Sequence, residues 1–444
     1  MDIDRLNPLV KRMASNLMQV KTGMPLQCAV ATVNYKLANL ASQIHVKVDT
    51  RCGFPPAPVN IYSLMLLNSG AGKNSSLTLI DKWYMTKVWN KIKIKIFPYY
   101  KHKAMDVLEK ANIQRELHSW VSSYNTGTTS GIMACAETYH LCQFGSFNVE
   151  VDEFGTAVTS KKELLEDLLS PYDNGDFKPT AKRSDTMSME ITGLPVNLYC
   201  FGNKVRLLDG DHTEKSFITL LDEGYGRRMI FVDDTSTPTV RTPEQVLEEF
   251  NASNQIALEA KELESYFDSL IVSDNFNRVI KLSDEALMIY ATIKAEGDNR
   301  VEEISNMYPA IIADLSERHF KTAKLAGIYA FYEGSTEITA EHMNQAFEVI
   351  KESSKVLEEL RTVQPVHERL LTRLLWERKK VTSQHMLKEY SFVRESWTRK
   401  ILEYIDLAKQ LASEKGYEWI EDSVGGVTYY QVIDNSKEIK GEVF

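Results

Sequence analysis

A short segment with the composition of a phosphate-binding loop lies between an apolar run and a helical pattern. The apolar run covers residues 62–67. The loop after it contains Ser69, Gly70, Ala71, Gly72, Lys73, Asn74 and Ser75. Small residues let backbone N–H groups wrap phosphates, a lysine reaches the outer phosphates, and the N-terminus of the next helix adds its dipole. The segment therefore predicts a nucleotide site on a strand, a glycine-bearing turn and a helix.

Two positions depart from the common pattern GxxxxGK[ST] of such loops. Leu67 stands where the first glycine would be, and Asn74 replaces the hydroxyl residue that ligates Mg²⁺. Because an asparagine carbonyl also coordinates hard cations, and Ser75 is adjacent, we expect Asn74 or Ser75 at the metal. A strand-to-helix turn with an exposed lysine is the alternative explanation of the same residues.

An acidic pair follows a second short strand pattern, about 80 residues after the phosphate loop. Residues 147–151 predict a strand, although Asn148 and Glu150 make it more polar than usual, and Asp152 and Glu153 come next. A nucleotide hydrolase needs one carboxylate in the Mg²⁺ shell and another group that polarises the attacking water. We expect Asp152 in the first role and Glu153 in the second. A strand that ends in Asp-Glu by chance is the alternative.

Composition and charge restrict the class of protein. The chain has 444 residues, of which 43% are hydrophobic and 25% charged, as in soluble globular proteins of two to four domains. Its net charge of −9 argues against a broad basic surface but not against a local basic stripe or an internal channel. The five cysteines form no CxxC pair, which favours free thiols in a reducing compartment. Without an apolar run of 18 residues or a signal-peptide pattern, we expect a cytoplasmic protein with no membrane partner.

The remaining patterns predict four consecutive regions. Residues 1–55 form a helical segment, 56–235 an α/β core, 236–362 a region that is almost wholly helical, and 363–444 a further domain. Within the core, a polar loop is expected over 122–131, and strands over 196–203 and 229–232. In the last region, helices over 366–378, 383–391 and 394–413 precede two strands around Gly425-Gly426, which is the winged-helix order.

Two segments are candidates for contact with nucleic acid. Lys178, Lys182 and Arg183 precede an alternating pattern and predict a hairpin with a basic tip. Residues 87–103 interleave lysines with aromatic side chains, a composition that suits single-stranded nucleic acid. For this second segment, a solvated helix face with an aromatic core side is the favoured explanation.

Paired arginines, Arg227 and Arg228, follow Gly224 and Gly226 at a turn before the strand over 229–232. A salt-bridged surface turn would explain them. They could also reach the phosphates bound by a neighbouring subunit, and only the surrounding elements favour that second explanation.

The order of these elements resembles a known family. It is similar to the order found in AAA+ ATPases of the replicative type, in particular the minichromosome maintenance helicases. The shared elements are a glycine loop, an Asp-Glu strand, a basic hairpin, a strand ending in Asn203, paired arginines before a strand, and a helical lid. The stretch 316–326, SERHFKTAKLA, resembles the arginine-bearing helix of that family. A closer resemblance is to primase-associated helicases borne by phages and plasmids, which share the leading helices, the SGAGK-type loop, the Asp-Glu pair and a YDNG-like loop. The resemblance covers about residues 25–360.

The resemblance implies a fold and a set of residue roles. The fold would be a P-loop NTPase core, a parallel sheet with helices on both faces, followed by a helical lid and a C-terminal winged helix. ATP and Mg²⁺ would be the cofactors, bound by the loop 69–75. The resemblance implies that Lys73 binds the outer phosphates, that Asp152 and Glu153 carry out hydrolysis, and that Asn203 is the first sensor. It implies that Arg227 or Arg228 is an arginine finger acting on the next subunit and that Arg318 is the second sensor. It also implies that a channel lined by Lys178, Lys182 and Arg183 binds single-stranded DNA.

The expected function is therefore that of an ATP-dependent DNA helicase or translocase in replication of a phage or mobile element. ATP would be hydrolysed between subunits of a homo-oligomeric ring, expected to be a hexamer, in the bacterial host cytoplasm, with a primase or polymerase as a further partner. The alternative is an ATP-switched DNA-binding assembly or loader with weak hydrolysis. A RecA-like packaging or recombination motor is more distant, because the helical lid and the late arginines argue against it.

Overall fold

The computed structural model describes residues 1–21, 23–67, 73–125, 129–177, 190–208, 212–233, 242–304, 308–361, 366–377, 379–390 and 401–434. The chain divides into two compact units, residues 1–204 with 219–359, and residues 205–218 with 360–444. Most of the three regions predicted over 1–362 falls in the first unit, and the region predicted from 363 onward falls in the second.

A five-stranded parallel sheet forms the centre of the first unit. Its strands in spatial order are β4 (Tyr124–Asn125), β5 (Phe147–Val151), β6 (Val196–Gly202), β3 (Tyr62–Leu66) and β7 (Met229–Asp233). The four longer strands confirm the predicted ones, and they are almost wholly buried, as expected for a parallel sheet covered on both faces. The prediction of a loop over 122–131 was wrong at β4. That strand has only two residues, so its pairing with Val149 and Glu150 defines it, and no local pattern does.

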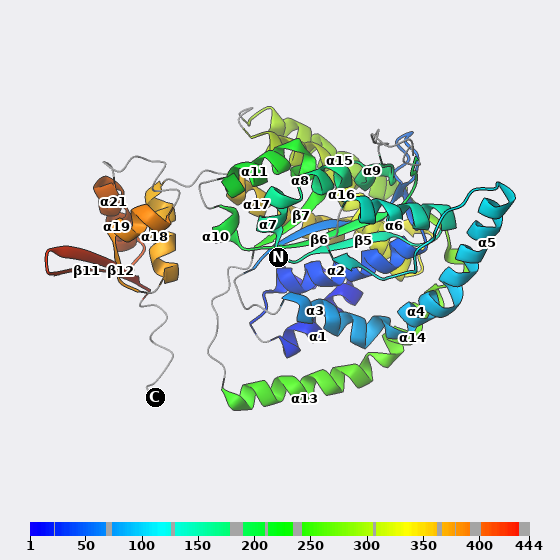
Figure 1. Ribbon diagram of the computed structural model, residues 1–444, viewed down its shortest axis with the longest axis horizontal. Helices are drawn as coiled ribbons and strands as arrows, with labels where there is room; N and C mark the ends of the chain where they lie inside the picture. The colour runs from blue at the N-terminus through cyan, green and yellow to red at the C-terminus, as the bar shows by residue number, and fades with distance from the viewer. Residues whose placement is uncertain are drawn as a thin grey trace. The chain divides into compact units, whose positions relative to one another are not determined.

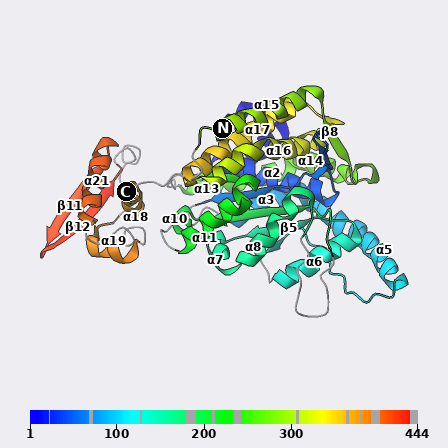
Figure 2. The same cartoon turned by 90° about the horizontal axis from the view of Figure 1, so that it is seen from above.

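Helices cover both faces of this sheet, which confirms the α/β class. On one face lie α2 (Leu26–Gln43) and α3 (Lys73–Ile80), and on the other lie α6 (Thr129–Cys142), α7 (Phe154–Ser160) and α8 (Lys162–Leu169), as Figures 1 and 2 show. The buried helix α2 packs against the sheet through Tyr35, whose ring stacks on that of Tyr199 at 4.5 Å between centroids. Its Lys36 is also buried, and the ammonium group lies 2.7 Å from an Asp81 carboxylate oxygen.

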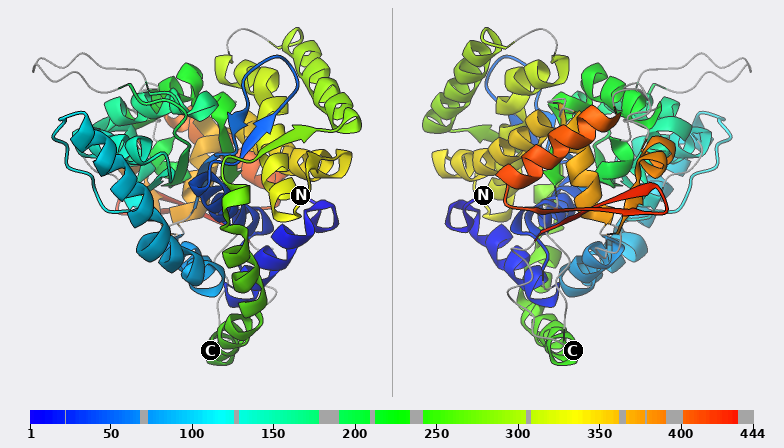
Figure 3. Two further views of the ribbon diagram at one scale, coloured as in Figure 1. Left: turned by 90° about the vertical axis from the view of Figure 1, so that its right-hand side faces the viewer. Right: turned by 90° about the vertical axis from the view of Figure 1, so that its left-hand side faces the viewer.

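A second sheet joins segments far apart in the chain. Its order is β2 (Ala57–Pro58), β1 (Lys47–Asp49), β8 (Val279–Leu282) and β9 (Glu337–Ile338). In the left view of Figure 3, the blue chain of β1 and β2 lies beside green β8. The predictions that residues 1–55 and 236–362 are helical were wrong at β1, β8 and β9. Strands of two to four residues are too short to show period-two alternation, and parallel pairing with distant segments defines them.

The helical region of the first unit packs onto its N-terminal helices. Its helices are α13 (Pro243–Glu259), α14 (Lys261–Leu270), α15 (Asp284–Val301), α16 (Pro309–Tyr332) and α17 (Ala340–Arg361), and the N-terminal ones are α1 (Pro8–Val20) and α2. From α16, the Tyr329 hydroxyl donates to Asn34 Oδ1 at 3.2 Å, and the Tyr332 hydroxyl donates to the Leu37 carbonyl at 3.0 Å. A Cβ atom on Gly327 would lie 2.2 Å from Val48 Cγ2, so α16 also requires glycine where it meets β1. Within the described ranges, no helix is both long and apolar enough to cross a membrane.

An arm of helical residues continues from α3 through η2 (Asp81–Met85), α4 (Thr86–Lys91), η3 (Ile92–Ile96) and α5 (Phe97–Lys110), cyan at the right of Figure 1. Its inner side contains buried Trp83 and Phe97, and Lys91 pairs with Asp268 at 3.3 Å. The arm thus has the aromatic core side that the sequence indicates. Its exposed positions include Lys93, Lys95, Tyr99 and Lys103.

The second unit has its own small core. It contains α18 (Val366–Glu377), β10 (Val381–Thr382), α19 (Ser383–Glu389), α21 (Ile401–Glu414), β11 (Glu418–Val424) and β12 (Val427–Ile433). Leucines of α18, Met386 of α19, and Ile405 and Ala408 of α21 pack with Tyr430 and Val432 of the hairpin. The predicted turn at Gly425-Gly426 is confirmed, since both glycines have positive φ, 60° and 80°, as two-residue hairpins require.

Candidate functional site

The carboxyl ends of three adjacent strands, β6, β3 and β7, are level with one another. Leu66 of β3 is paired with Gly202 of β6 on one side and with Asp233 of β7 on the other. The ladder continues one residue further, since the Leu67 amide donates to the Gly202 carbonyl at 2.8 Å. Polar residues that follow these strands therefore come together at one edge of the sheet, here called the carboxyl edge.

The acidic pair reaches the same edge from β5. Val151 is paired with Cys200, so Glu153 continues to the level of Gly202. The Glu153 carbonyl accepts the amides of Thr156 and Ala157, both at 3.0 Å, and thereby starts α7. Both carboxylate side chains, Asp152 and Glu153, are exposed, which suits groups that must meet a ligand. Asn203 follows β6 directly and is half-buried at this edge.

The helix α3 begins at Lys73, seven residues beyond the end of β3 at the carboxyl edge. Backbone N–H groups of a first helical turn have no intrahelical acceptor and attract anions. Ser75 in this turn is half-buried. The remaining predicted loop positions, Ser69, Gly70, Ala71 and Gly72, lie outside the described residues, as do the side chains of Lys73 and Asn74.

The carboxyl edge also holds an ion pair that the sequence did not predict. Lys204 Nζ, next to Asn203, contacts Asp233 Oδ2, and the Asp233 side chain is buried. Because β6 and β7 flank β3, this pair spans the carboxyl end of β3. The only signal in the sequence is the acidic residue after Val232 at a strand end. The side chains at this edge supply oxygen ligands of the kind that Mg²⁺ uses and a cation suited to phosphate, so they fit bound ATP and Mg²⁺.

The paired arginines lie at the opposite edge of the sheet. They end α12 (Gly226–Arg228), directly before the first residue of β7. Because β7 has five residues at a rise of about 3.3 Å each, the backbone of Arg228 is about 16 Å from the carboxyl edge. That separation is longer than an arginine side chain.

The two arginines differ in what holds them. Arg228 is buried, and it donates to Asp173 Oδ2 at 2.8 Å and to the Gly224 carbonyl at 3.3 Å. Gly224 has φ 139°, and a Cβ atom there would lie 2.4 Å from Arg228 Nη1, so this turn accepts only glycine. Arg227 is 37% exposed and approaches the same Asp173 oxygen only at 3.9 Å. Both line a cavity of about 450 Å³ with several acidic residues.

Arg318 belongs to a buried network and not to the carboxyl edge. It donates to Asp314 Oδ2 at 3.1 Å, and Lys321 Nζ contacts the other Asp314 oxygen at 2.5 Å. Lys321 also donates to the carbonyl of Met229, the first residue of β7, at 3.1 Å. Burial alone would raise the pKa of the Asp314 carboxyl, but the charges of Lys321 and Arg318 lower it below its usual range. The structure thus places Arg318 at the amino end of β7.

Replacing Asp314 with asparagine is expected to lower the free energy of unfolding by about 3–5 kcal/mol, because Lys321 and Arg318 would lose a buried counter-ion. Asp298→Asn is the matched control, since the Lys294–Asp298 pair on α15 is about half exposed on both sides and contributes at most about 1 kcal/mol. Urea unfolding at pH 7 measures both. Equal effects of the two substitutions would show that the network is not a buried charge pair.

The predicted DNA-binding residues Lys178, Lys182 and Arg183 lie outside the described residues. The segment that contains them is bounded by an antiparallel pair, in which the Phe177 amide donates to the Ile191 carbonyl at 2.9 Å. Just beyond this pair, the Leu194 amide donates to the Gly175 carbonyl at 3.0 Å. The described residues on either side of that segment, Phe177 and Ile191, thus lie side by side, and Ile191 precedes β6 by five residues.

Comparison with models of known protein families finds no match, and comparison with curated proteins finds no similar sequence.

Proposed function

We propose that this chain is an ATPase of the AAA+ type that assembles into a ring and translocates along single-stranded DNA. The observation that carries the proposal is the division of candidate groups between the two edges of one parallel sheet. The phosphate loop, Asp152, Glu153 and Asn203 follow strands at the carboxyl edge, whereas Arg227 and Arg318 lie at the amino ends. One subunit thus carries two separate halves of a site, and a neighbouring subunit would complete each half.

The topology favours ligand binding at the carboxyl edge. The chain leaves β3 toward β4 at one side of the sheet, and it leaves β6 toward β7 at the other. Right-handed crossovers in opposite directions place their helices on opposite faces, and the crevice between such strands is where open α/β sheets bind ligands. The positive end of α3, which follows β3 in the chain, would supply backbone N–H groups to a phosphate in this crevice.

Different residues would bind the nucleotide and catalyse its hydrolysis. Lys73 and the first turn of α3 would bind the outer phosphates, while Asp152 with Ser75 or Asn74 would hold Mg²⁺, which supplies charge stabilisation when bound. Glu153 would accept a proton from the attacking water, and Asn203 would orient that water. Lys204 would lie beside the phosphates, its position set by buried Asp233.

The trans role of the arginines is supported by distance and by exposure. The strand length of about 16 Å separates the α12 arginines from the carboxyl edge of their own sheet. Since Arg228 is committed to Asp173 and the Gly224 carbonyl, Arg227 is the better candidate for the finger. Arg318 lies at the same end of β7, but its bond to buried Asp314 makes it a weaker candidate than Arg227 for a role on the neighbouring subunit.

ATP turnover measured at several protein concentrations, with and without an oligo-dT strand, tests the proposal. We expect turnover per subunit to fall as the oligomer dissociates on dilution, because each site needs a neighbour, and to rise when the strand is added. Nucleotide binding, measured separately with a fluorescent ATP analogue, is the control. Binding without turnover under all conditions would favour the ATP-switched loader, and absence of binding would refute the nucleotide site.

A further inference from the structure

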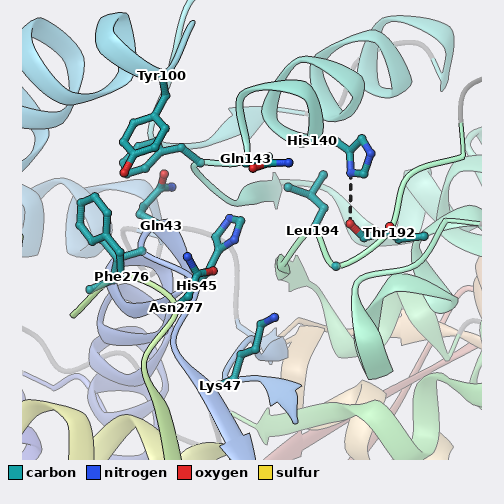
Figure 4. Close-up of a pocket in the computed structure, with 13 residues that line it drawn as sticks. Gln43, His45, Lys47, Tyr100, His140, Gln143, Thr192, Leu194, Phe276 and Asn277 are labelled. Carbon is teal, nitrogen blue, oxygen red and sulfur yellow. Dashed lines mark hydrogen bonds between the residues drawn. The ribbon is translucent and has the colours of Figure 1, made fainter. Parts of the chain in front are cut away.

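A cavity of about 360 Å³ lies at the amino ends of β5 and β6, on the opposite edge from the proposed ATP site. Five separate segments form it: residues 43–47, Tyr100 of α5, residues 140–144, residues 192–194, and residues 276–277. Figure 4 shows the Tyr100 and Phe276 rings at one side, His140 with Thr192 at the other, and Lys47 below them.

The charge of the cavity is opposite to that of the whole chain. Among the described residues that line it, Lys47 carries a positive charge and none carries a carboxylate. The chain as a whole has a net charge of −9. Lys47 forms no ion pair within the described ranges. A cavity with a lysine and no acid in an acidic protein favours an anionic ligand.

One side of the cavity is aromatic. The Tyr100 and Phe144 rings stack at 5.0 Å with an interplanar angle of 16°, and Phe276 lies 5.8 Å from Phe144 and 6.1 Å from Tyr100. This group of rings offers a surface on which a flat ligand can stack.

Polar groups complete the lining. Burial lowers the pKa of His45 to about 4, so its ring is neutral near pH 7. Its Nε2 donates to the Gly145 carbonyl at 2.7 Å, which leaves Nδ1 as an acceptor. Gln143 and Asn277 carry exposed amide side chains and have φ of 50° and 58°. His45 shares this conformation, and since His45 and Gln143 follow the ends of α2 and α6, these turns bring polar side chains to the same cavity.

We infer that the cavity binds one nucleotide unit of a single-stranded nucleic acid. The base stacks on the rings of Tyr100 and Phe276, the amides of Gln143 and Asn277 meet its edge, and Lys47 with His140 meets the phosphate. The neighbours of the cavity favour a strand over a free nucleotide. Residues 192–194 follow the basic residues Lys178, Lys182 and Arg183 in the chain, beginning nine residues after Arg183. The inference takes its partner from the proposed function but does not depend on ATP hydrolysis.

The arm that contributes Tyr100 to the cavity carries further basic and aromatic side chains. Lys93, Lys95 and Lys103 are exposed on the same arm as Tyr100, and Lys103 Nζ lies 4.4 Å from the centroid of the exposed Tyr99 ring. Lysines and aromatic rings spaced along the arm would contact further phosphates and bases, as binding of several consecutive nucleotides requires.

Anisotropy of a labelled dT12 strand, titrated without ATP at several salt concentrations, tests the inference. We expect Tyr100→Leu to weaken binding roughly five- to a hundredfold, because one stacked base is lost. Lys47→Gln should weaken binding and reduce the slope of log K against log salt by about 0.7, the value of one phosphate contact on a single strand. Lys281→Gln on neighbouring β8 is the matched control, since its side chain is 64% exposed and lies outside the cavity.

Cross-linking of the wild type with a 4-thiothymidine strand keeps the test independent of variant folding, and cross-links to Tyr100, Phe144 or Phe276 are expected. Unchanged affinity and slope in both variants, with cross-links elsewhere, would overturn the inference. So would competition by dTMP as strong as that by dT12, which would indicate a site for free nucleotides. If the proposed ATPase function is wrong, the wild type will show no ATP turnover. The DNA-binding results can still be interpreted in that case, because they are measured without ATP.

Discussion

Replacing Glu153 with glutamine is expected to leave ATP binding unchanged and to lower turnover by at least about a hundredfold. The exposed Glu153 carboxylate follows β5 at the carboxyl edge, and its backbone starts α7. Glutamine keeps the shape of the side chain and the capacity to accept a hydrogen bond, but it cannot take a proton from water. General-base catalysis of this kind contributes about 10²–10⁴ in rate.

Lys73→Ala should have a different effect from Glu153→Gln, because the lysine would provide a direct charge contact to the outer phosphates. We expect it to abolish ATP binding and turnover together. Titration with a fluorescent ATP analogue separates the two variants, and phosphate release measures turnover. Glu163→Gln, an exposed position in the first turn of α8, is the matched control and should behave like the wild type. If both site variants hydrolyse ATP normally, neither segment forms a nucleotide site.

Arg227→Ala is expected to lower turnover by about 10³–10⁵ without weakening ATP binding by the same subunit. An arginine that stabilises charge on the transferred phosphoryl group acts in the transition state, so removing it affects rate far more than binding. Arg228→Ala should instead reduce stability, because Arg228 is buried against Asp173 and the Gly224 carbonyl. Thermal unfolding of the two variants distinguishes these roles.

Mixing Arg227→Ala subunits with Glu153→Gln subunits tests whether the arginine acts on a neighbour. In a mixed ring, some interfaces join an intact Glu153 of one subunit to an intact Arg227 of the next. Those interfaces should hydrolyse ATP, so partial activity should return although each variant alone is inactive. An arginine that acts in its own subunit would give no recovery, because every site would carry one defect.

The complementation experiment needs evidence that mixed oligomers form. Light scattering at the assay concentration, together with co-purification of one tagged variant with the other, provides it. Mixed rings that stay inactive would contradict the inter-subunit site. Arg227 would then be explained as part of the surface turn that pairs loosely with Asp173, at 3.9 Å.

Several elements could be predicted from the sequence because their signals are local. Buried parallel strands need continuous apolar runs, and β3, β6 and β7 contain such runs within five to seven residues. The β11–β12 hairpin depends on two adjacent glycines that accept positive φ. The order of polar residues after strands also indicated which positions could form a site.

Other elements depend on partners that are distant in the chain. The strands β1, β4 and β9 have two or three residues each, and they exist because their backbone groups pair with segments such as β8, β5 and β8, respectively. The cavity beside α5 has the same origin, since Lys47, Tyr100, Gln143 and Asn277 come from separate segments. No window of the sequence contains enough of these residues to show a pattern.

For the candidate site, the sequence by itself determined the residue types and their order, and the tertiary structure decided their distances and availability. Arg227 and Arg228 are adjacent and chemically identical, so composition and spacing could not separate them. The fold separates them, because Gly224 and Asp173 enclose Arg228 and leave Arg227 more than a third exposed. Likewise, strand register alone brings Lys204 onto Asp233 across the end of β3. Such roles follow from long-range pairing of backbone groups, which no local residue pattern encodes.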